Sequence, residues 1–533
     1  MKMKEIEFNL LDEPWIRVLL PDYQVKEVSL TEALLKAHTY VDLAGELPTQ
    51  DVAVLRLLLA VLLTVFLRVD EEGNEAPLEE PDKATDRWEA LWDLGAFPEE
   101  PIRSYLETWH ERFWLFHPER PFWQVPEASM GTEYGAAKLN GEISESSNKL
   151  RLFTSYAGQG KTEITYAQAA RWLLYINGFD DTSSKPKVKG LPSPGAGWLG
   201  KLGLITVQGK NLFETLMLNL TLLKDGESLW EEPKPCWELE KPRSGERTEI
   251  VEPDNYPELL TLQSRRLLLY REDDHVVGYR LLGGDFFNKE NAFSEQMTVW
   301  KKDAEKKNMP ETFSPKRHNA SIQFWREFPA IFTGKAVRVP GVVRWIQRLN
   351  WKKVVHFRIA SVAYGDKDFF VTDTFSDSLT FHASLLDELG KNWQERIQME
   401  IENCHRAAGS LWILAKNLQI AAGGDENNIT TNIKDQFYYQ IDQPFREWLA
   451  SIDIDSDRDE MQQAWQDTAR KTAYTLGWSM VIQTGPAAFS GRILKKKEKG
   501  KNAEEKAYHY SAPEAFNTFC IQLNQIYKRG DTL

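Results

Sequence analysis

The chain has 533 residues, of which 65 are Lys or Arg and 79 are Asp or Glu, so its formal charge at pH 7 is −14. Its length predicts roughly two to four domains, and a composition of 42% hydrophobic and 27% charged residues is typical of a soluble globular protein. As a total, the negative charge argues against a general binder of nucleic acids or anionic membranes, because Lys and Arg drive such binding. The three cysteines, Cys236, Cys404 and Cys520, are too far apart to indicate a disulfide framework or a Cys-based zinc site.

The first part of the chain mixes short helices with short strands. Ser29 and Glu32 have the spacing of a capping box, and the patterns at residues 52–67, 166–176 and 212–223 predict further helices. Short β-rich segments at residues 204–207 and 354–362 are separated from them by Gly and Pro. We therefore predict an irregular α+β domain at residues 1–370.

The most apolar stretch, residues 52–69, is interrupted by Arg56 and closed by Arg68. The apolar run is too short to cross a bilayer, so it predicts a buried helix and no membrane partner. The first residues contain neither the apolar region nor the small-residue cleavage site of a secretion signal. We expect a cytoplasmic protein.

The pattern changes after residue 377. Apolar side chains recur every three or four residues from Trp393 to Leu418, and Gly423 and Gly424 then end the predicted helix. Three more helices are predicted at residues 436–452, at 460–484 and from a capping pattern at Ser511. We therefore predict a C-terminal four-helix bundle at residues 378–533. The Lys-rich stretch 491–506, which includes Lys495 to Lys501, is predicted to be a solvated loop, with a DNA contact as the alternative.

No motif in the sequence predicts a catalytic site. Residues 195–200 fit G-x-G-x-x-G, but the prolines before them argue against the strand that a dinucleotide site needs. Residues 158–162 resemble the end of a phosphate-binding P-loop, yet its first glycine is replaced by Ser155. The nine histidines show no metal-binding spacing, and His117 lies among aromatic residues as a structural histidine would. We expect no enzymatic activity, no metal and no cofactor.

The negative charge is local. Residues 70–120 hold 15 acids and 5 bases, and residues 225–258 hold 11 acids and 4 bases. In contrast, residues 146–162 and 182–213 contain no acid, and residues 313–365 contain ten bases and one acid, Glu327, interleaved with aromatic residues. Grouped bases of this kind favour contact with nucleic-acid phosphates, although a solvated surface gives the same pattern.

Four segments resemble a known family: residues 8–18, the helix start at 47–51, residues 113–125 and residues 194–200. They look like the CasA family, the large subunits of the type I-E CRISPR surveillance complex Cascade. The resemblance covers essentially the whole chain. It implies a non-catalytic protein that reads the protospacer-adjacent motif in duplex DNA, helps to open the duplex for guide RNA, and recruits the helicase-nuclease. Its implied partners are the other Cascade subunits, the guide RNA and the target duplex.

The resemblance also implies contact residues. The family's first loop is similar to residues 153–155, and its glycine-rich loop falls within residues 183–190, where lysines replace glycines and favour phosphate clamping. Its minor-groove lysine most resembles Lys289, and its wedge hairpin lies near residues 333–338, which contain no glutamine. The nucleic-acid contacts implied in this way are Phe153, Thr154, Ser155, Lys185, Lys187, Val188, Lys189, Gly190, Lys289, Lys335 and Arg338.

Two other function classes stay open from the sequence. The abundance of Trp and acids also fits a carbohydrate-active hydrolase, which needs two carboxylates facing each other across a Trp-lined cleft. Alternatively, the chain is a scaffold whose basic stretches meet RNA or an acidic protein and never touch duplex DNA.

Overall fold

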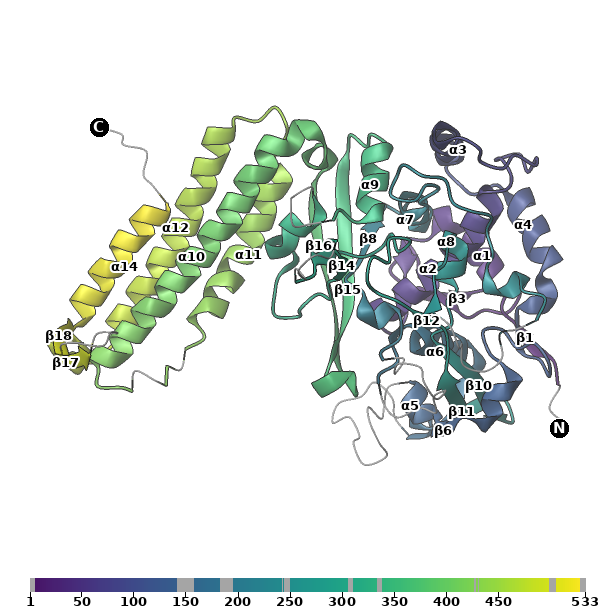
Figure 1. Cartoon of the computed structure of the whole chain (residues 1–533), viewed down its shortest axis with the longest axis horizontal. Coiled ribbons are helices and arrows are strands. Elements are labelled where there is room, and N and C mark those ends of the chain that lie inside the picture. The colour runs from purple at the N-terminus through teal and green to yellow at the C-terminus, as the bar shows by residue number, and fades with distance from the viewer. Residues whose placement is uncertain are drawn as a thin grey trace. The chain divides into compact units, whose positions relative to one another are not determined.

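The computed structural model describes residues 5–140, 158–182, 195–241, 243, 250–304, 310–332, 338–425, 428–429, 431–497 and 505–527 (Figure 1). The chain forms two compact units, one of Met1–Trp351 with Val355–Leu379 and one of Lys352–Val354 with Thr380–Leu533. The domain limits of 1–370 and 378–533 stay a prediction. The mixed helix and strand content agrees with the predicted α+β class.

The helices of the first unit surround one long apolar helix. The helices are α1 (Leu30–Leu35), α2 (Pro48–Phe66), α3 (Pro81–Asp93), α4 (Glu99–Thr108), α5 (Ala136–Leu139), α6 (Tyr166–Phe179), α7 (Leu212–Asn219), α8 (Tyr256–Leu260) and α9 (Gly341–Arg348). Helix α2 contacts α6 and α8. By length and composition α2 could cross a membrane, but 94% of its apolar window is buried inside the protein. The predicted buried helix at 52–67 is therefore confirmed.

The strands of the first unit form several small sheets. They are β1 (Glu7–Asn9), β2 (Ile16–Leu19), β3 (Val25–Val28), β4 (Asp42–Leu43), β5 (Trp114–Phe116), β6 (Thr132–Gly135), β7 (Ile164–Thr165), β8 (Leu204–Gln208), β9 (Ile250–Val251), β10 (Arg265–Glu272), β11 (His275–Gly283), β12 (Phe286–Phe287), β13 (Trp300–Lys302) and β14 (Phe313–Pro315). The largest sheet has the order β10-β11-β6, with β7 also pairing with β11. Strand β15 (Val354–Tyr364) lies between β8 and β16 (Val371–His382).

Local sequence signals set the helix starts. The Ser29 hydroxyl accepts a hydrogen bond from the Glu32 amide and begins α1, as predicted. Helix α7 begins at Leu212 but ends at Asn219, four residues earlier than predicted. The Asn219 side chain causes this end, because its amide donates to the Val207 carbonyl at 2.6 Å and accepts from the Val207 N–H at 3.0 Å, which ties the chain to β8.

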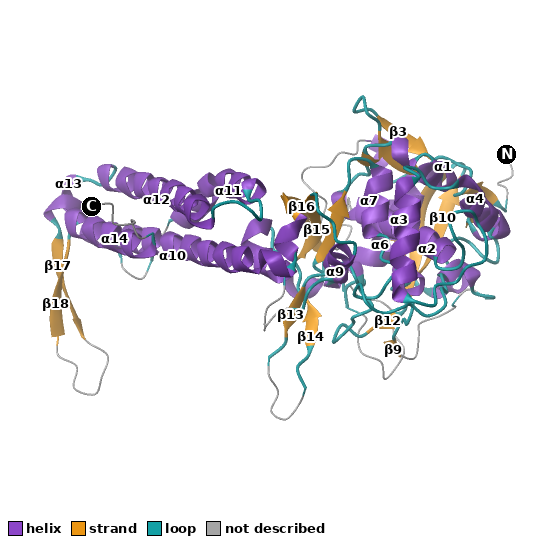
Figure 2. Cartoon of the chain, turned by 90° about the horizontal axis from the view of Figure 1, so that it is seen from above, coloured by secondary structure: helices purple, strands orange, loops and turns teal. Residues whose placement is uncertain are grey.

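The second unit contains long helices that run alongside one another (Figure 2). They are α10 (Lys391–Ala421), α11 (Ile433–Ser451), α12 (Arg458–Ile482) and α14 (Ala512–Ile526), with the short α13 (Pro486–Ser490) before the last. Helix α10 contacts α11, α12 and α14. Gly423 follows α10 with φ +97°, a conformation that favours glycine and ends a helix, as predicted.

The predicted solvated loop at residues 491–506 is wrong at its two ends, while residues 498–504 lie outside the described part of the chain. These residues include β17 (Arg492–Lys497), which pairs antiparallel with β18 (Glu505–Tyr510) as a hairpin. Ile493 pairs with His509 and Leu494 with Tyr508. Apolar and aromatic residues favour strands, so the lysines in this stretch did not prevent pairing.

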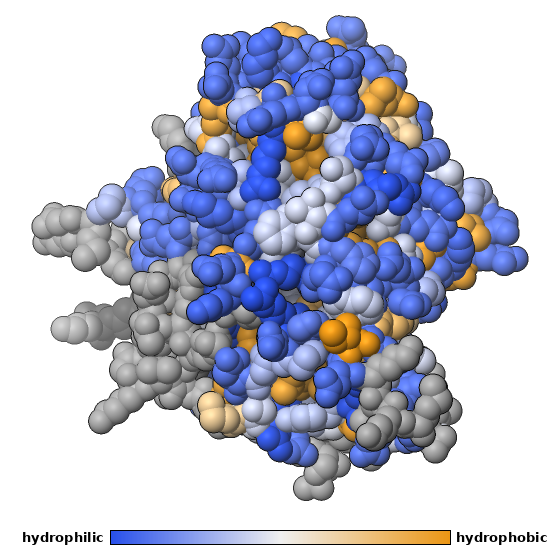
Figure 3. All heavy atoms as spheres, turned by 90° about the vertical axis from the view of Figure 1, so that its right-hand side faces the viewer, coloured by the Kyte–Doolittle hydropathy of each residue, from blue (hydrophilic) through white to orange (hydrophobic). Residues whose placement is uncertain are grey.

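The face of the molecule drawn in Figure 3 is mostly hydrophilic. Hydrophobic residues occur there in separate small patches between the hydrophilic ones, as far as the described residues cover it. Scattered patches of this size are ordinary for a protein surface. This view therefore gives no single large apolar docking surface.

Candidate nucleic-acid interface

Most of the predicted contact residues lie outside the described part of the chain. These are Phe153, Thr154, Ser155, Lys185, Lys187, Val188, Lys189, Gly190 and Lys335. The structure does describe Lys289 and Arg338, together with the residues that flank the other predicted contacts. The interface is therefore built from these two residues and from the flanking positions.

Lys289 belongs to a group of four cations, Lys201, Arg265, Lys289 and Arg317, which we call the basic cluster. Lys289 is exposed, two residues after β12, while Lys201 ends a short 3₁₀ helix (Leu199–Lys201). Burial, together with the positive charges of the other three members, lowers the pKa of Lys201 to about 8. Among the charges that influence this pKa most, the Asp368 carboxylate opposes the positive ones without outweighing them.

Two members of the basic cluster are fixed by carboxylates. Arg317 forms a bidentate ion pair with Asp368, with both N–O distances at 2.8 Å, and its guanidinium lies 4.8 Å from the ring centroid of Tyr364. The Arg265 guanidinium is buried and pairs with Asp180 at 2.5 Å. These pairs hold the two arginines in place, whereas Lys289 extends into solvent.

Residues 183–194, which we call the Lys-rich segment, lie outside the described part of the chain, but the residues that flank them are bonded to a member of the basic cluster and to the ion-pair partner of another. On one side, Thr182 donates from its N–H to the Asp368 carbonyl at 2.9 Å and from its hydroxyl to the Lys367 carbonyl at 2.8 Å. On the other side, Arg265 donates to the Gly195 carbonyl at 2.7 Å. The described residues on the two sides of the Lys-rich segment are therefore bonded to Arg265 and to Asp368, the ion-pair partner of Arg317.

Arg338 occupies a different environment. Its guanidinium forms an ion pair with Asp225 and lies 3.6 Å from the ring centroid of Phe293. Burial lowers the pKa of Arg338, while the Asp225 carboxylate opposes this change. Arg338 thus anchors the chain directly after residues 333–337, and its contact with DNA stays a prediction.

Glu327, the single acid of the basic stretch 313–365, forms ion pairs with neighbouring side chains of the fold. Glu327 accepts from Lys316 at 2.7 Å and contacts His318 at 2.9 Å. Burial raises the pKa of Glu327, but the hydrogen bonds to His318 and Lys316 outweigh burial and lower it to about 2. Glu327 therefore stays ionised and neutralises neighbours within the fold.

Gly197 and Gly200 of the 195–200 motif lie where neighbouring atoms leave no room for a side chain. A Cβ atom on Gly197 would overlap the Gly178 carbonyl, and one on Gly200 would overlap the Tyr364 hydroxyl. Between them, the Trp198 indole donates to Glu295 at 2.9 Å. These close contacts explain the glycines without a phosphate ligand.

Two pockets of the described residues give no support for a hydrolytic site. One pocket is lined by Arg, Gln, Cys and aromatic residues around Trp237, and another by mainly apolar residues around Trp198. Neither lining contains Asp or Glu, so neither provides the carboxylate pair of a glycoside hydrolase. Within the same described ranges, no group of three or more His, Cys, Asp or Glu side chains could hold a metal ion.

Sequence reasoning missed three members of the basic cluster. Lys201 and Arg317 lie in the acid-depleted stretches at 182–213 and 313–365, so local charge gave a signal for both. Arg265 begins β10 without any such signal, since only the fold brings it to Asp180 and Gly195.

Comparison with known proteins gives consistent matches. A sequence profile described as CRISPR-associated protein Cse1 matches residues 9–476. A CasA/Cse1 protein of Thermus thermophilus is 32% identical over 350 residues, so this alignment spans 64% of this chain and 64% of the relative. The crystal structure of Thermobifida fusca Cse1 has a TM-score of 0.80 and 27% identity, covering 98% of each chain. A chain of a structure described as a CRISPR RNA-guided surveillance complex shares the fold, with a TM-score of 0.68, 17% identity and coverage of 97% of this chain and 99% of that one.

Proposed function

Because this chain belongs to the CRISPR-associated Cse1 family, we propose that it is the non-catalytic large subunit of a type I-E Cascade surveillance complex. In this role it recognises the protospacer-adjacent motif in duplex DNA, helps to destabilise the duplex for guide pairing, and recruits the helicase-nuclease. It works in the cytoplasm with the other Cascade subunits, the guide RNA and the target duplex.

The observation that carries this proposal is the basic cluster, one member of which, Arg265, is bonded to Gly195 directly after the Lys-rich segment. Duplex DNA presents a row of phosphates, and grouped lysines bind it by releasing condensed counterions. Phosphate contacts position a protein, while base edges supply motif recognition. In the minor groove those edges are degenerate, so a lysine such as Lys289 tolerates several motif variants and guide pairing supplies the remaining specificity.

The Lys-rich segment provides the direct test. Lys185, Lys187 and Lys189 are changed together to Glu in the assembled complex, and the affinity for a duplex carrying the motif is measured against salt concentration. If all three lysines contact phosphates, the slope of log K against log salt falls by up to about 2.7. An unchanged affinity at low salt together with an unchanged slope contradicts the proposal.

Lys210 offers a matched control for charge. It is exposed and lies in the same acid-depleted stretch, but it is not among the charges that shift the pKa of Lys201. Lys210→Glu is expected to leave the salt slope unchanged within about 0.3. An equal loss in this variant indicates a general effect of net charge instead of a local contact.

The other predicted contacts are assigned two roles, contact at the guide RNA end and opening of the DNA strands. Phe153, Thr154 and Ser155 are proposed to lie at the guide RNA end, and Lys335 with Arg338 to act as the wedge. A wedge needs mainly bulk to separate a base step, so the missing glutamine does not prevent this role. With the base analogue 2-aminopurine next to the motif, Lys335→Ala is expected to reduce the fluorescence increase on binding, while retention of the full increase contradicts the assignment.

We also propose that α10, α11, α12 and α14 form a four-helix bundle domain. Their mutual contacts involve buried side chains on each helix, such as Trp393, Phe445, Trp465 and Phe519. A chain of residues 378–533 is expected to be helical and to unfold cooperatively. A non-cooperative loss of its far-ultraviolet circular dichroism with urea contradicts an independent domain.

A scaffold without duplex contact is the second candidate. It is favoured by the net charge of −14, which predicts weak binding of DNA by the isolated chain. Retention of a randomised motif library by the complex, with and without this subunit, separates the two. Motif enrichment that depends on the subunit supports recognition, and its absence supports the scaffold.

A further inference from the structure

A small pocket in the first unit has a lining rich in arginine. It is formed by the aromatic segment at 120–124, by residues near Cys236, and by side chains from neighbouring loops. Its lining residues are Arg112, Arg120, Pro121, Phe122, Trp123, Gln124, Cys236, Trp237, Leu239, Arg243 and Gln263. The volume of about 40 Å³ is enough to admit a small anion.

The charge of this lining is the opposite of its surroundings. Most of the lining comes from or directly follows residues 70–120 and 225–258, the two stretches that hold 15 and 11 acids. Among the described residues none of those acids lines the pocket, whereas three arginines do. A pocket whose described lining holds arginines and no acid favours an anionic ligand.

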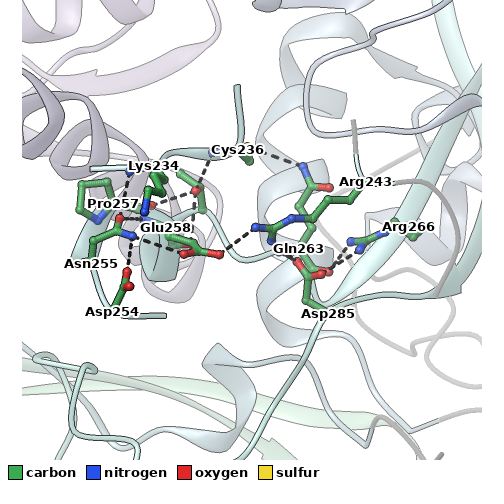
Figure 4. Close-up of polar contacts among 11 residues, drawn as sticks. Lys234, Cys236, Arg243, Asp254, Asn255, Pro257, Glu258, Gln263, Arg266 and Asp285 are labelled. Atoms are coloured by element: carbon green, nitrogen blue, oxygen red, sulfur yellow. Dashed lines mark hydrogen bonds and ion pairs between the residues drawn. The ribbon is translucent and has the colours of Figure 1, made fainter. Parts of the chain in front are cut away.

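One of the three arginines is already neutralised. Figure 4 shows Arg243 between Glu258, at 2.8 Å, and Asp285, at 3.2 Å, and Arg266 pairs with the other oxygen of Asp285 at 2.8 Å. These bonds fix Arg243 as a rigid wall of the pocket. Burial raises the pKa of Cys236 to about 12, so its thiol adds no negative charge.

The other two arginines have no such partner. Among the described residues, no carboxylate lies within ion-pair distance of Arg112 or Arg120. Arg112 instead donates to the Leu239 carbonyl at 3.1 Å. Burial lowers the pKa of Arg112, and the charge of Arg120 lowers it further, so the two guanidinium groups repel each other. An anion between them would remove this repulsion.

Trp123 adds a further unusual feature to the pocket wall. Its backbone has φ +56°, a conformation that side chains such as Trp rarely adopt. The residue is 7% exposed, and its indole N–H is buried without a hydrogen-bond acceptor among the described residues. Buried donors of this kind are uncommon, and backbone strain concentrates at binding sites.

We propose that this pocket is an oxyanion site that takes a phosphate group, held by Arg112 and Arg120 against the wall of Arg243 and Trp123. Arginine forks match the oxygen geometry of phosphate, and two of them provide bidentate recognition. The site is separate from the basic cluster and does not depend on motif recognition. The phosphate comes from solution, from a nucleic-acid end or from a nucleic-acid backbone.

The test is calorimetric titration of sodium phosphate into the full chain at constant ionic strength. The variants are Arg120→Gln, the double variant Arg112→Gln with Arg120→Gln, and the control Arg103→Gln, an exposed arginine of the same acidic stretch that pairs with Glu99. Saturable binding at one site is expected for the wild type and for the control. The affinity of Arg120→Gln for phosphate should be at least tenfold weaker, and the double variant should show no detectable binding. No saturable binding, or equal affinity in Arg120→Gln, overturns the proposal. The Arg120 guanidinium makes no ion pair with another described residue, so its variant tests binding without removing a pair that holds the fold.

Competition then identifies the source of the phosphate. A short oligonucleotide with a 5′-phosphate and the same strand with a 5′-hydroxyl are each added before the titration. Displacement by the phosphorylated strand alone supports a site for a nucleic-acid end, and displacement by both supports a backbone contact. Binding of inorganic phosphate that neither strand displaces supports a site for the free ion.

Discussion

Raising the pH above 8 should weaken DNA binding through Lys201. Burial and the neighbouring positive charges lower the pKa of this amine to about 8, against an ordinary value of 10.5. About 90% of the amine is protonated at pH 7 and about 10% at pH 9. A phosphate placed at the basic cluster favours the charged amine, so binding above pH 8 requires uptake of one proton. The affinity should therefore fall by up to about fivefold between pH 8 and 9.

The assay is fluorescence anisotropy of a labelled duplex with the assembled complex, from pH 6 to 9 at constant ionic strength. Lys201→Arg keeps its charge throughout, because guanidinium stays protonated in this range, and its affinity should not change with pH. Lys201→Met lacks the charge at every pH, so its affinity should be low and also constant.

One pattern of results refutes this reasoning. If the wild type and Lys201→Arg show the same pH dependence, another group is responsible. Asp51 is the relevant alternative, since burial raises its pKa to about 7. Its carboxyl is largely ionised above pH 8, so a change confined to pH 6–8 in all variants indicates Asp51 and excludes Lys201.

Three further predictions concern stability. Glu295→Ala leaves Arg56 buried without its ion pair, so the free energy of unfolding in urea should fall by about 3–5 kcal/mol, and Glu295→Gln should cost less. Gly200→Ala should destabilise the fold by about 1–3 kcal/mol, with partial recovery when Tyr364→Phe removes the overlapping hydroxyl, as measured by thermal unfolding. The pKa of Glu327 is about 2, against an ordinary value of 4.5. Its contribution to the free energy of unfolding, on the order of 2–3 kcal/mol, is therefore present above pH 4.5 and is lost as the pH falls toward 2. In acid titrations Glu327→Gln should lack this loss of stability.

Periodic segments were predictable from sequence because their pattern is local. The apolar repeat from Trp393 to Leu418 predicted α10, and the capping pattern at Ser511 predicted the start of α14. The resemblance to CasA is confirmed by the match of the Cse1 profile over residues 9–476. Each of these signals lies within a continuous stretch of chain.

Features that depend on distant partners could not be predicted. Helix α7 ends early because Asn219 bonds to β8, and the lysines at 495–497 lie in a strand because residues 505–510 pair with them. The basic cluster gathers side chains from four separate segments, and Arg338 is held by Asp225 from an acidic stretch. Local charge indicated where bases occur but not which carboxylates neutralise them.

Hydroxyl-radical footprinting of the target duplex is the most direct measurement of DNA contact at the basic cluster. The complete complex is compared with one that carries Lys201→Glu and Lys289→Glu, with Lys210→Glu as the control. The predicted result is protection of the duplex beside the guide-paired region in the wild type and the control, and loss of that protection in the double variant. Unchanged protection in the double variant contradicts a DNA interface at this site.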